Sequence, residues 1–150
     1  MAPDPRLRGL LGDWTGTEEL FPTAWTEAGS ARGALSIEPG PDGILLDYVE
    51  SRDGADGAPL VAHAVVAGTG FWWFDTYGFT PAAPGTAVWE DGALVLERRS
   101  DRGRTVTRLR PDGDRLTLEL DTAVPADADP SPLVRGIYTR RSPHPGHSAS

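Results

Sequence analysis

Hydrophobic positions recur in short runs along the chain, and turn-forming residues separate these runs. The runs are rich in Val, Leu, Ile, Thr and aromatic residues, and none keeps a helical period for long. A spacing of about 8 to 12 residues between turn signals rich in Gly, Pro and Asp is typical of an all-β domain. The pattern predicts about ten strands, at residues 13–21, 31–38, 44–52, 59–67, 71–77, 86–90, 93–99, 104–110, 115–121 and 133–140.

The connections between these runs favour an up-and-down meander. Pro41-Asp42-Gly43, Asp53-Gly54, Asp91-Gly92 and Pro111-Asp112-Gly113 tolerate positive φ and close hairpins. Ten strands without a helical layer must close on themselves or divide into two sheets, because open edges promote aggregation. We expect an all-β fold with a single closed barrel of about ten antiparallel strands, and a barrel of this size should enclose a cavity.

The segments outside the strands add little regular structure. Residues 6–11 predict one short helix before the first strand, and residues 21–30 can hold a second. The polar, proline-containing residues 142–150 are expected to form a disordered tail. The chain is therefore predicted to contain one β-barrel domain over residues 1–141, followed by that tail.

Composition restricts the chemistry and the partners. The 150 residues contain no cysteine and no lysine, which excludes disulfides, thiolate metal sites, cysteine nucleophiles and lysine Schiff bases. The N-terminus lacks an apolar stretch long enough for a signal peptide or a membrane span, so we expect a cytoplasmic protein. A formal charge of -8 disfavours nucleic acids and anionic membranes as partners and favours a neutral, apolar or cationic small molecule.

Two short motifs carry a family resemblance. Leu11-Gly12-Asp13-Trp14-Thr15-Gly16-Thr17-Glu18 resembles the G-x-W-x-G opening strand of nitrobindin and its uncharacterised relatives, which are calycin-type β-barrels akin to fatty-acid-binding proteins. Gly136-Ile137-Tyr138-Thr139-Arg140 resembles the closing strand of the fatty-acid-binding proteins. The resemblance extends loosely over residues 7–141 and implies a calycin-like or lipocalin-like barrel around a ligand.

Two departures weaken the transfer of that family's ligands. Nitrobindin binds haem through a histidine near its last strands, whereas residues 121–141 contain no histidine. Fatty-acid-binding proteins place a cation two residues before the closing tyrosine, where this chain has Gly136. Haem is further disfavoured because Met1 is the only methionine, which leaves His63 or a tyrosine as axial ligands, and we expect no cofactor.

The first predicted strand contains a candidate acid. Alternation places Trp14, Gly16, Glu18 and Leu20 on one face, which we expect to point inward. Trp14 would then plug one end of the barrel, and burial would raise the pKa of Glu18 and make it a candidate general acid or base. The alternative is a solvent-facing carboxylate near the end of the strand.

The stretch GFWWFDTYGF, residues 70–79, concentrates six aromatic rings around one acid. Alternation divides it into two sets: Phe71, Trp73, Asp75 and Tyr77 on one face, and Trp72, Phe74 and Thr76 on the other. We expect the set with Asp75 and Tyr77 to line the cavity, because a few polar groups among rings are typical of a ligand site. The alternative is a packed aromatic core with Asp75 at a turn.

Several further residues are candidates for the site. Tyr48, Trp89 and Tyr138 are expected to contact the ligand, and His63 is either an interior base or an ordinary hydrogen-bonded histidine. Arg108 shares a face with Val106 and is the one arginine considered for an inward, anion-binding role, although a solvated outer face is the alternative. No carboxylate cluster has metal-ligand spacing, so we predict no metal site.

These patterns leave three hypotheses on function. The first is a module that binds a small hydrophobic or aromatic molecule through the candidate contacts Trp14, Tyr48, Phe71, Trp73, Trp89, Arg108 and Tyr138. The second is a cofactor-independent isomerase, cyclase or dehydratase that acts on a hydrophobic metabolite such as a natural product, with Glu18, His63, Asp75 or Tyr77 as acid or base. The third is a structural domain whose exposed aromatic patch forms a homodimer interface.

Overall fold

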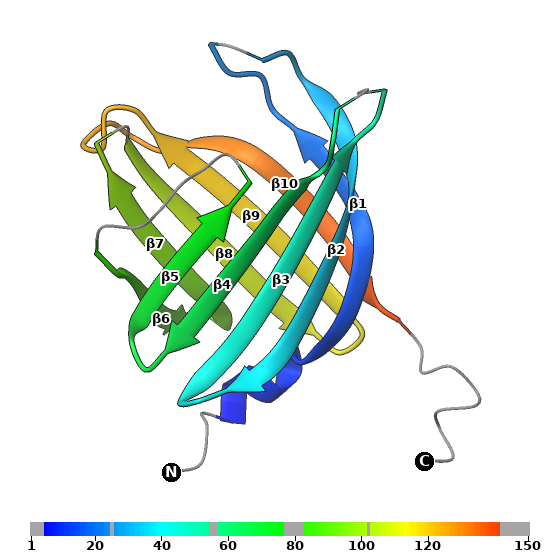
Figure 1. The fold of residues 1–150 in the computed structure, drawn as a ribbon, viewed down its shortest axis with the longest axis vertical. Coiled ribbons are helices and arrows are strands. Elements are labelled where there is room, and N and C mark those ends of the chain that lie inside the picture. Colours follow the sequence, from blue (N-terminus) through cyan, green and yellow to red (C-terminus); the bar gives the residue numbers. More distant parts are fainter. Residues whose placement is uncertain (1–4, 25, 55–56, 77–82, 102, 142–150) are drawn as a thin grey trace.

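A computed structural model describes residues 5–24, 26–54, 57–76, 83–101 and 103–141 (Figure 1). One 3-10 helix, η1 (Pro5–Leu10), precedes the strands. The strands are β1 (Gly12–Leu20), β2 (Gly29–Gly40), β3 (Gly43–Arg52), β4 (Leu60–Ala67), β5 (Gly70–Asp75), β6 (Gly85–Glu90), β7 (Ala93–Ser100), β8 (Gly103–Asp112), β9 (Arg115–Ala123) and β10 (Ser131–Arg140). The predicted tail at residues 142–150 and the candidate residue Tyr77 lie outside the described residues.

The strands form one closed antiparallel barrel. Each strand pairs with its neighbours in the sequence, and β1 pairs with β10 to complete the wall (Figure 1). Asp42 and Asp91 have φ values of 58° and 52° at two of the tight connections, as the Asp-Gly turns predict. The predicted closed up-and-down barrel is confirmed, and the alternative of two separate sheets is wrong.

Helical structure is limited to the start of the described chain. The helix predicted at residues 6–11 is present as η1, and no helix in the described residues is long and apolar enough to cross a bilayer. Gly29 and Ser30 already belong to β2, and the described residues before them include a turn in which the Thr26 amide donates to the Thr23 hydroxyl oxygen at 3.0 Å. This local hydrogen bond competes with a helix, so the second helix is absent from those residues.

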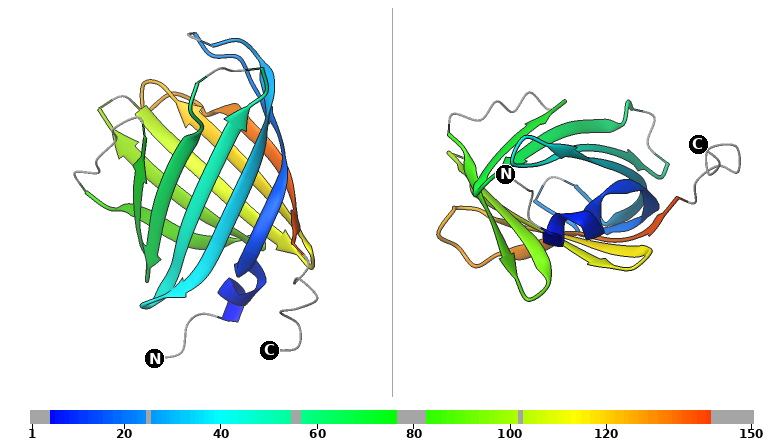
Figure 2. Two further views of the ribbon diagram at one scale, coloured as in Figure 1. Left: turned by 45° about the vertical axis from the view of Figure 1, so that its right-hand side comes forward. Right: turned by 90° about the horizontal axis from the view of Figure 1, so that it is seen from below.

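The helix and Trp14 close one end of the barrel, which we call the η1 end. Leu7, Leu10 and Trp14 are buried there, and the Trp14 indole Nε1 donates to the Leu10 carbonyl at 2.9 Å. The Arg140 guanidinium covers the Trp14 ring, with its carbon 4.2 Å from the ring centroid. Trp14 therefore occupies the plugging position that its sequence context predicts, and η1 lies across part of this end (Figure 2).

The inward side chains change in character along the barrel. Near the η1 end they are large and apolar: Ile37, Ile44, Leu46, Phe71, Leu94, Leu96, Leu109 and Leu116. Toward the opposite end, which we call the far end, polar groups join them: Glu18, Tyr48, Glu50, Asp75, Arg98 and Tyr138. The fold thus places the candidate chemistry away from η1.

One seam of the wall is much shorter than the others. Among the described residues, β5 and β6 pair only at Gly70 with Thr86 and at Phe71 with Gly85. The β2 and β3 pairing, by comparison, runs continuously from Ala31 to Gly40. The wall is therefore weakest beside β5.

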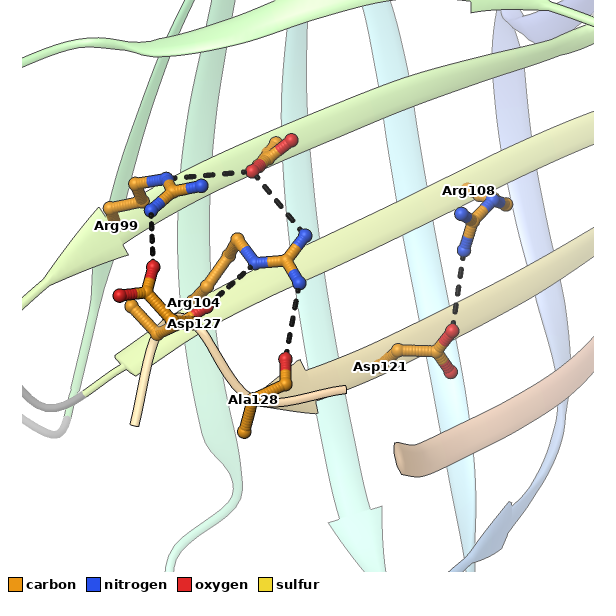
Figure 3. Close-up of polar contacts among 8 residues, drawn as sticks. Arg99, Arg104, Arg108, Asp121, Asp127 and Ala128 are labelled. Carbon is orange, nitrogen blue, oxygen red and sulfur yellow. Dashed lines mark hydrogen bonds and ion pairs between the residues drawn. The ribbon is translucent and has the colours of Figure 1, made fainter. Parts of the chain in front are cut away.

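Ion pairs link outward-facing side chains of β7 to β10, and Figure 3 shows those on β7, β8 and β9. Glu97 lies 3.7 Å from Arg99 and 3.6 Å from Arg104, and Arg104 also donates to backbone carbonyls after β9. Arg108 pairs with Asp121 at 3.3 Å, and Asp121 is also 2.7 Å from Arg135 on β10. These arginines organise the surface of the barrel and leave its interior to other residues.

Candidate functional site

A buried carboxyl group and two buried tyrosines meet inside the barrel. Glu18 on β1 is 3% exposed, Tyr48 on β3 is 3% exposed and Tyr138 on β10 is fully buried. The Tyr138 hydroxyl donates to Glu18, and the Tyr48 oxygen lies 2.7 Å from Oε2 and 2.9 Å from Oε1 of Glu18. The Tyr48 oxygen is also 2.7 Å from Oε2 of Glu50, so one phenol links two carboxyl groups. We call these four residues the Glu18 cluster.

Glycines on three adjacent strands provide the space for this cluster. Gly16 on β1 faces Gly33 on β2 and Tyr138 on β10. A Cβ atom on Gly33 would overlap the Tyr138 hydroxyl, and a Cβ atom on Gly136 would lie 3.2 Å from Cγ of Glu18. Small residues at these positions therefore let the acid and the phenol approach each other.

The hydrogen bonds of the Glu18 cluster require a proton on one carboxyl group. Tyr48 has one proton to donate but lies within hydrogen-bond distance of both Glu18 and Glu50, so one acid must donate to the phenol oxygen. Burial, the largest cause, and a hydrogen bond with Glu50 together raise the pKa of Glu18 to about 8, although the hydrogen bonds from Tyr138 and Tyr48 act in the opposite direction. Glu18 is therefore mainly protonated at neutral pH.

The same burial keeps both phenols neutral. Desolvation and the nearby Glu18 raise the pKa of Tyr48 and that of Tyr138. The cluster thus offers a neutral acid and two neutral hydroxyl groups, which can both donate and accept hydrogen bonds.

A second polar group lies next to the Glu18 cluster. The Trp73 indole Nε1 donates to Oδ2 of Asp75 at 2.9 Å, and the Arg98 guanidinium carbon lies 5.2 Å from the centre of the Trp73 ring. Burial lowers the pKa of Arg98, while the charge of Asp75 opposes this shift. The rings of Trp73 and Tyr48 are 6.3 Å apart, so aromatic contact joins the two groups.

The inward polar side chains nearest the far end are less buried than the Glu18 carboxyl group. Glu50, Asp75 and Arg98 point inward, as their hydrogen bonds and ring contacts show, yet all three are half-buried and not fully buried. Thr105, which pairs with Arg98, is also half-buried. A small molecule arriving from this end would meet these groups before it met Glu18.

Most of the aromatic candidates lie in the interior. Trp14, Tyr48, Phe71, Trp73 and Tyr138 are buried. They do not form one group, because Trp14 lies at the η1 end while Tyr48, Trp73 and Tyr138 lie at or beside the Glu18 cluster.

The face of β5 with Asp75 points inward, as expected. On the opposite face Trp72 is half-buried and Phe74 is 42% exposed. Trp89 is half-buried near η1, where the Arg6 guanidinium carbon lies 5.2 Å from its ring centre. Trp89 is therefore separate from the Glu18 cluster.

His63 lies outside the barrel, contrary to the prediction of an interior base. Its side chain is 69% exposed on the outer face of β4 and pairs with Asp47 on β3. The physical reason is alternation, because the small neighbours Ala62 and Ala64 take the inward positions. His63 is thus the ordinary surface histidine of the alternative reading.

Arg108 is also outside, so the prediction of an inward cation at this position is wrong. It is 38% exposed and pairs with Asp121, while its neighbour Thr107 is buried inside (Figure 3). The inward cation is Arg98, which sequence reasoning missed together with Glu50. Side-chain alternation could have identified both residues, because Arg98 lies two positions after Leu96 and Glu50 lies two positions after Tyr48.

A haem site does not fit the described residues. His63, the histidine considered as an axial ligand, faces solvent on the outer wall. The two tyrosines of the interior are engaged by Glu18, and no group of three or more His, Asp or Glu residues in the described chain could hold a metal ion. In the described part of the chain, the candidate axial ligands therefore lie outside the barrel or are engaged by Glu18.

The described chain forms a closed antiparallel barrel of ten strands. No protein-family model matches the chain, and no curated protein matches its sequence. Among solved structures, Rv2717c from M. tuberculosis aligns with a TM-score of 0.62 at 17% identity, over 94% of this chain and 100% of that one. The S-type phycobiliprotein lyase CPES from Guillardia theta aligns with a TM-score of 0.65 at 11% identity, over 92% of each chain. At these identities the similarity establishes the fold alone.

Proposed function

We propose that the barrel binds one small hydrophobic or aromatic molecule in the polar half of its interior. The observation that carries this proposal is the Glu18 cluster, a neutral acid and two phenols held together on the inward face. Trp73 and Tyr48 supply ring surface for an apolar body, and Glu18 with Tyr138 supplies a donor and an acceptor for one polar group. Such a combination is typical of small-molecule sites.

The ligand that fits best carries a neutral polar group, such as a hydroxyl or a carbonyl. Gly136 stands where fatty-acid-binding proteins place a cation, and its nearest buried neighbours with ionisable side chains are the phenol Tyr138 and the acid Glu18. A carboxylate ligand would meet acidic groups there, whereas a neutral group can form hydrogen bonds with the cluster without a charge penalty.

We also propose that the chain is a divergent relative of the nitrobindin-like barrels and that it acts in the cytoplasm. The opening motif supports the first proposal, because Trp14 fills the η1 end and Gly16 lets Tyr138 pack against β1. The absence of cysteine supports the second.

Calorimetric titration with β-naphthol, a flat probe with one hydroxyl group, tests the binding proposal. We expect Glu18→Gln to weaken binding by about tenfold. A change of this size corresponds to one buried hydrogen bond to the ligand that is lost or wrongly paired. Glu119→Gln is the matched control, because Glu119 lies on the outer wall next to Arg135 and should leave affinity unchanged. Equal affinity in wild type, Glu18→Gln and Tyr138→Phe would refute the site.

An enzyme is the second candidate, and the protonated state of Glu18 favours it. Glu18 can give its proton to a carbonyl oxygen of a bound ketone while the Glu50 carboxylate takes a proton from the adjacent carbon, which yields the enol. Tyr48 contacts both acids and can return the proton, so the cycle needs no cofactor. Asp75 lies beside this group. One solved barrel of this fold is named a lyase, which gives the enzyme reading a precedent.

Deuterium exchange distinguishes an enzyme from a binder. α-Tetralone, an enolisable aromatic ketone, is incubated in heavy water, and incorporation at the carbon next to the carbonyl is followed by proton NMR. An enzyme of this type should exceed the buffer rate and lose at least about a hundredfold in Glu18→Gln, with Glu119→Gln unaffected. Incorporation of deuterium at the buffer rate would refute acid-base catalysis on this class of ketone. Binding would then remain the proposed function.

A further inference from the structure

A separate pocket of about 730 Å³ opens at the η1 end of the barrel. Its volume lies within the range of small-molecule sites. Arg6 and Arg8 of η1 line one side of it, and Val66, Ala87, Trp89 and Leu94 line the barrel side. None of these residues belongs to the Glu18 cluster.

The pocket exists because η1 covers only part of its end of the barrel. The helix rests against β8, where a Cβ atom on Gly9 would lie 3.4 Å from Pro111, and Arg140 of β10 donates to the Gly9 carbonyl. Seen from below, η1 lies beside the ends of β8 and β9 (Figure 2). The ends of β4, β6 and β7 contribute the pocket walls on the side that the helix leaves uncovered.

The walls of this pocket combine apolar surface with positive charge. Val66, Ala87 and Leu94 are buried inward residues that form an apolar floor, and Trp89 is a half-buried aromatic wall. The Arg6 guanidinium lies over the Trp89 ring, and Arg8 is exposed on the same helix. Asp42 is the acid that also lines the pocket, so the cations outnumber the acids here although the whole chain carries a charge of -8.

We propose that this pocket binds a flat aromatic anion. The ring lies on the apolar floor against Trp89, and the acid group faces Arg6 and Arg8, whose guanidinium groups match carboxylate geometry. The site is independent of the proposed function, because none of the residues that line it belongs to the Glu18 cluster.

A pair of probes that differ only in charge tests this site. β-Naphthoate carries the anion, and β-naphthalenemethanol replaces it with a neutral hydroxymethyl group. We expect wild type to bind β-naphthoate about tenfold more tightly than the alcohol by calorimetry. In two-dimensional NMR the indole signal of Trp89 should shift on titration with β-naphthoate.

Variants identify the groups responsible. Arg6→Gln should abolish the preference for the anion, and Trp89→Leu should weaken both probes by about tenfold. Arg32→Gln is the matched control, because Arg32 is exposed on β2 away from the pocket. Near-ultraviolet circular dichroism verifies that each variant is folded.

Two outcomes would overturn the proposal. Equal preference for the anion in Arg6→Gln and Arg32→Gln would mean that Arg6 only packs on Trp89. Loss of β-naphthoate binding in Glu18→Gln, with Arg6→Gln unaffected, would place the anion in the polar half of the interior. If β-naphthol does not bind at the Glu18 cluster, the proposal for the pocket at the η1 end is unaffected, because that site is tested through Glu18 and this one through Arg6.

Discussion

Glu18 is buried, and desolvation together with its hydrogen bond to Glu50 favours its protonated form. Two phenols and a second carboxyl group surround it, and one shared proton satisfies hydrogen bonds that two carboxylates could not. Because the proton belongs to the folded state, the residue couples the stability of the barrel to pH.

Stability should therefore fall as pH rises through the range in which the folded chain keeps this proton and the unfolded chain loses it. The pKa of Glu18 is raised from 4.5 to about 8, so the contribution is complete below pH 4.5 and is lost as pH approaches 8. Each pKa unit corresponds to about 1.4 kcal/mol, which gives a total of several kcal/mol. Urea unfolding across this range measures it.

The amide variant provides the control for this prediction. Glu18→Gln is permanently neutral, so its free energy of unfolding should change less over the same range. A slope equal to that of wild type would show that other groups dominate the pH dependence.

Gly33 should be sensitive to the smallest substitution. The Cβ atom of Gly33→Ala would overlap the Tyr138 hydroxyl and displace it from Glu18. We expect a loss of about 1 to 3 kcal/mol in the free energy of unfolding, as for other overpacked cores. Gly57→Ala is the control, because nothing lies within 4 Å of its Cβ position, and equal effects in the two variants would contradict the packing explanation.

Among the elements, β5 has the least support. It keeps its pairing with β4 over Ala62 to Ala67, but its pairing with β6 ends at Phe71 in the described chain. The contact between Arg98 and Trp73 links β7 to β5 beyond that point, so side chains replace part of the missing ladder.

Hydrogen exchange should reveal this weak seam. Peptides covering β5 and β6 should exchange faster than peptides covering β2 and β3, because local opening follows the density of backbone hydrogen bonds. Mass spectrometry on the native protein measures the order of exchange. Uniform protection around the barrel would contradict the prediction, and Arg98→Gln should increase exchange in β5 further.

The elements themselves could be predicted from the sequence, because strands and tight turns depend on local signals. Asp42 and Asp91, each followed by Gly, predict hairpins from local sequence alone, and the alternation of side chains predicts the inward face of β1. The site was only partly accessible to the same reasoning. Glu18 and Tyr138 are far apart in sequence, and their contact depends on the pairing of β1 with β10 and on the space left by Gly33.

Errors in predicting the site had a common cause. His63 and Arg108 have the chemistry of site residues, but side-chain alternation along their strands places both on the outer face of the barrel. Side-chain alternation places Arg98 and Glu50 on the inward face, but both lie near strand ends. There a sequence alone does not distinguish an inward residue from a turn residue.

On the scale of the whole molecule, the barrel depends on the pairing of its first and last strands. β10 pairs with β1 from Trp14 to Leu20, and it contributes Tyr138 to the interior. The wall therefore closes only when the last strand of the chain is in place.

Two truncations test this dependence. Removal of residues 131–150 should abolish cooperative thermal unfolding, because it removes β10 and exposes the edges of β1 and β9. Removal of residues 142–150 alone is the control, and it should leave the midpoint of unfolding unchanged. Cooperative unfolding of the longer truncation would show that the remaining strands close without β10.

The meeting of the two chain ends at the helix has a practical consequence. Arg140 donates to carbonyl groups of Gly9 and Leu11, so the beginning and the end of the folded chain are neighbours. A short peptide linker can therefore join them, and new ends can be opened at Gly113, where a Cβ atom would meet nothing. Such a circularly permuted barrel would keep every strand pair, because only the turn between β8 and β9 is cut.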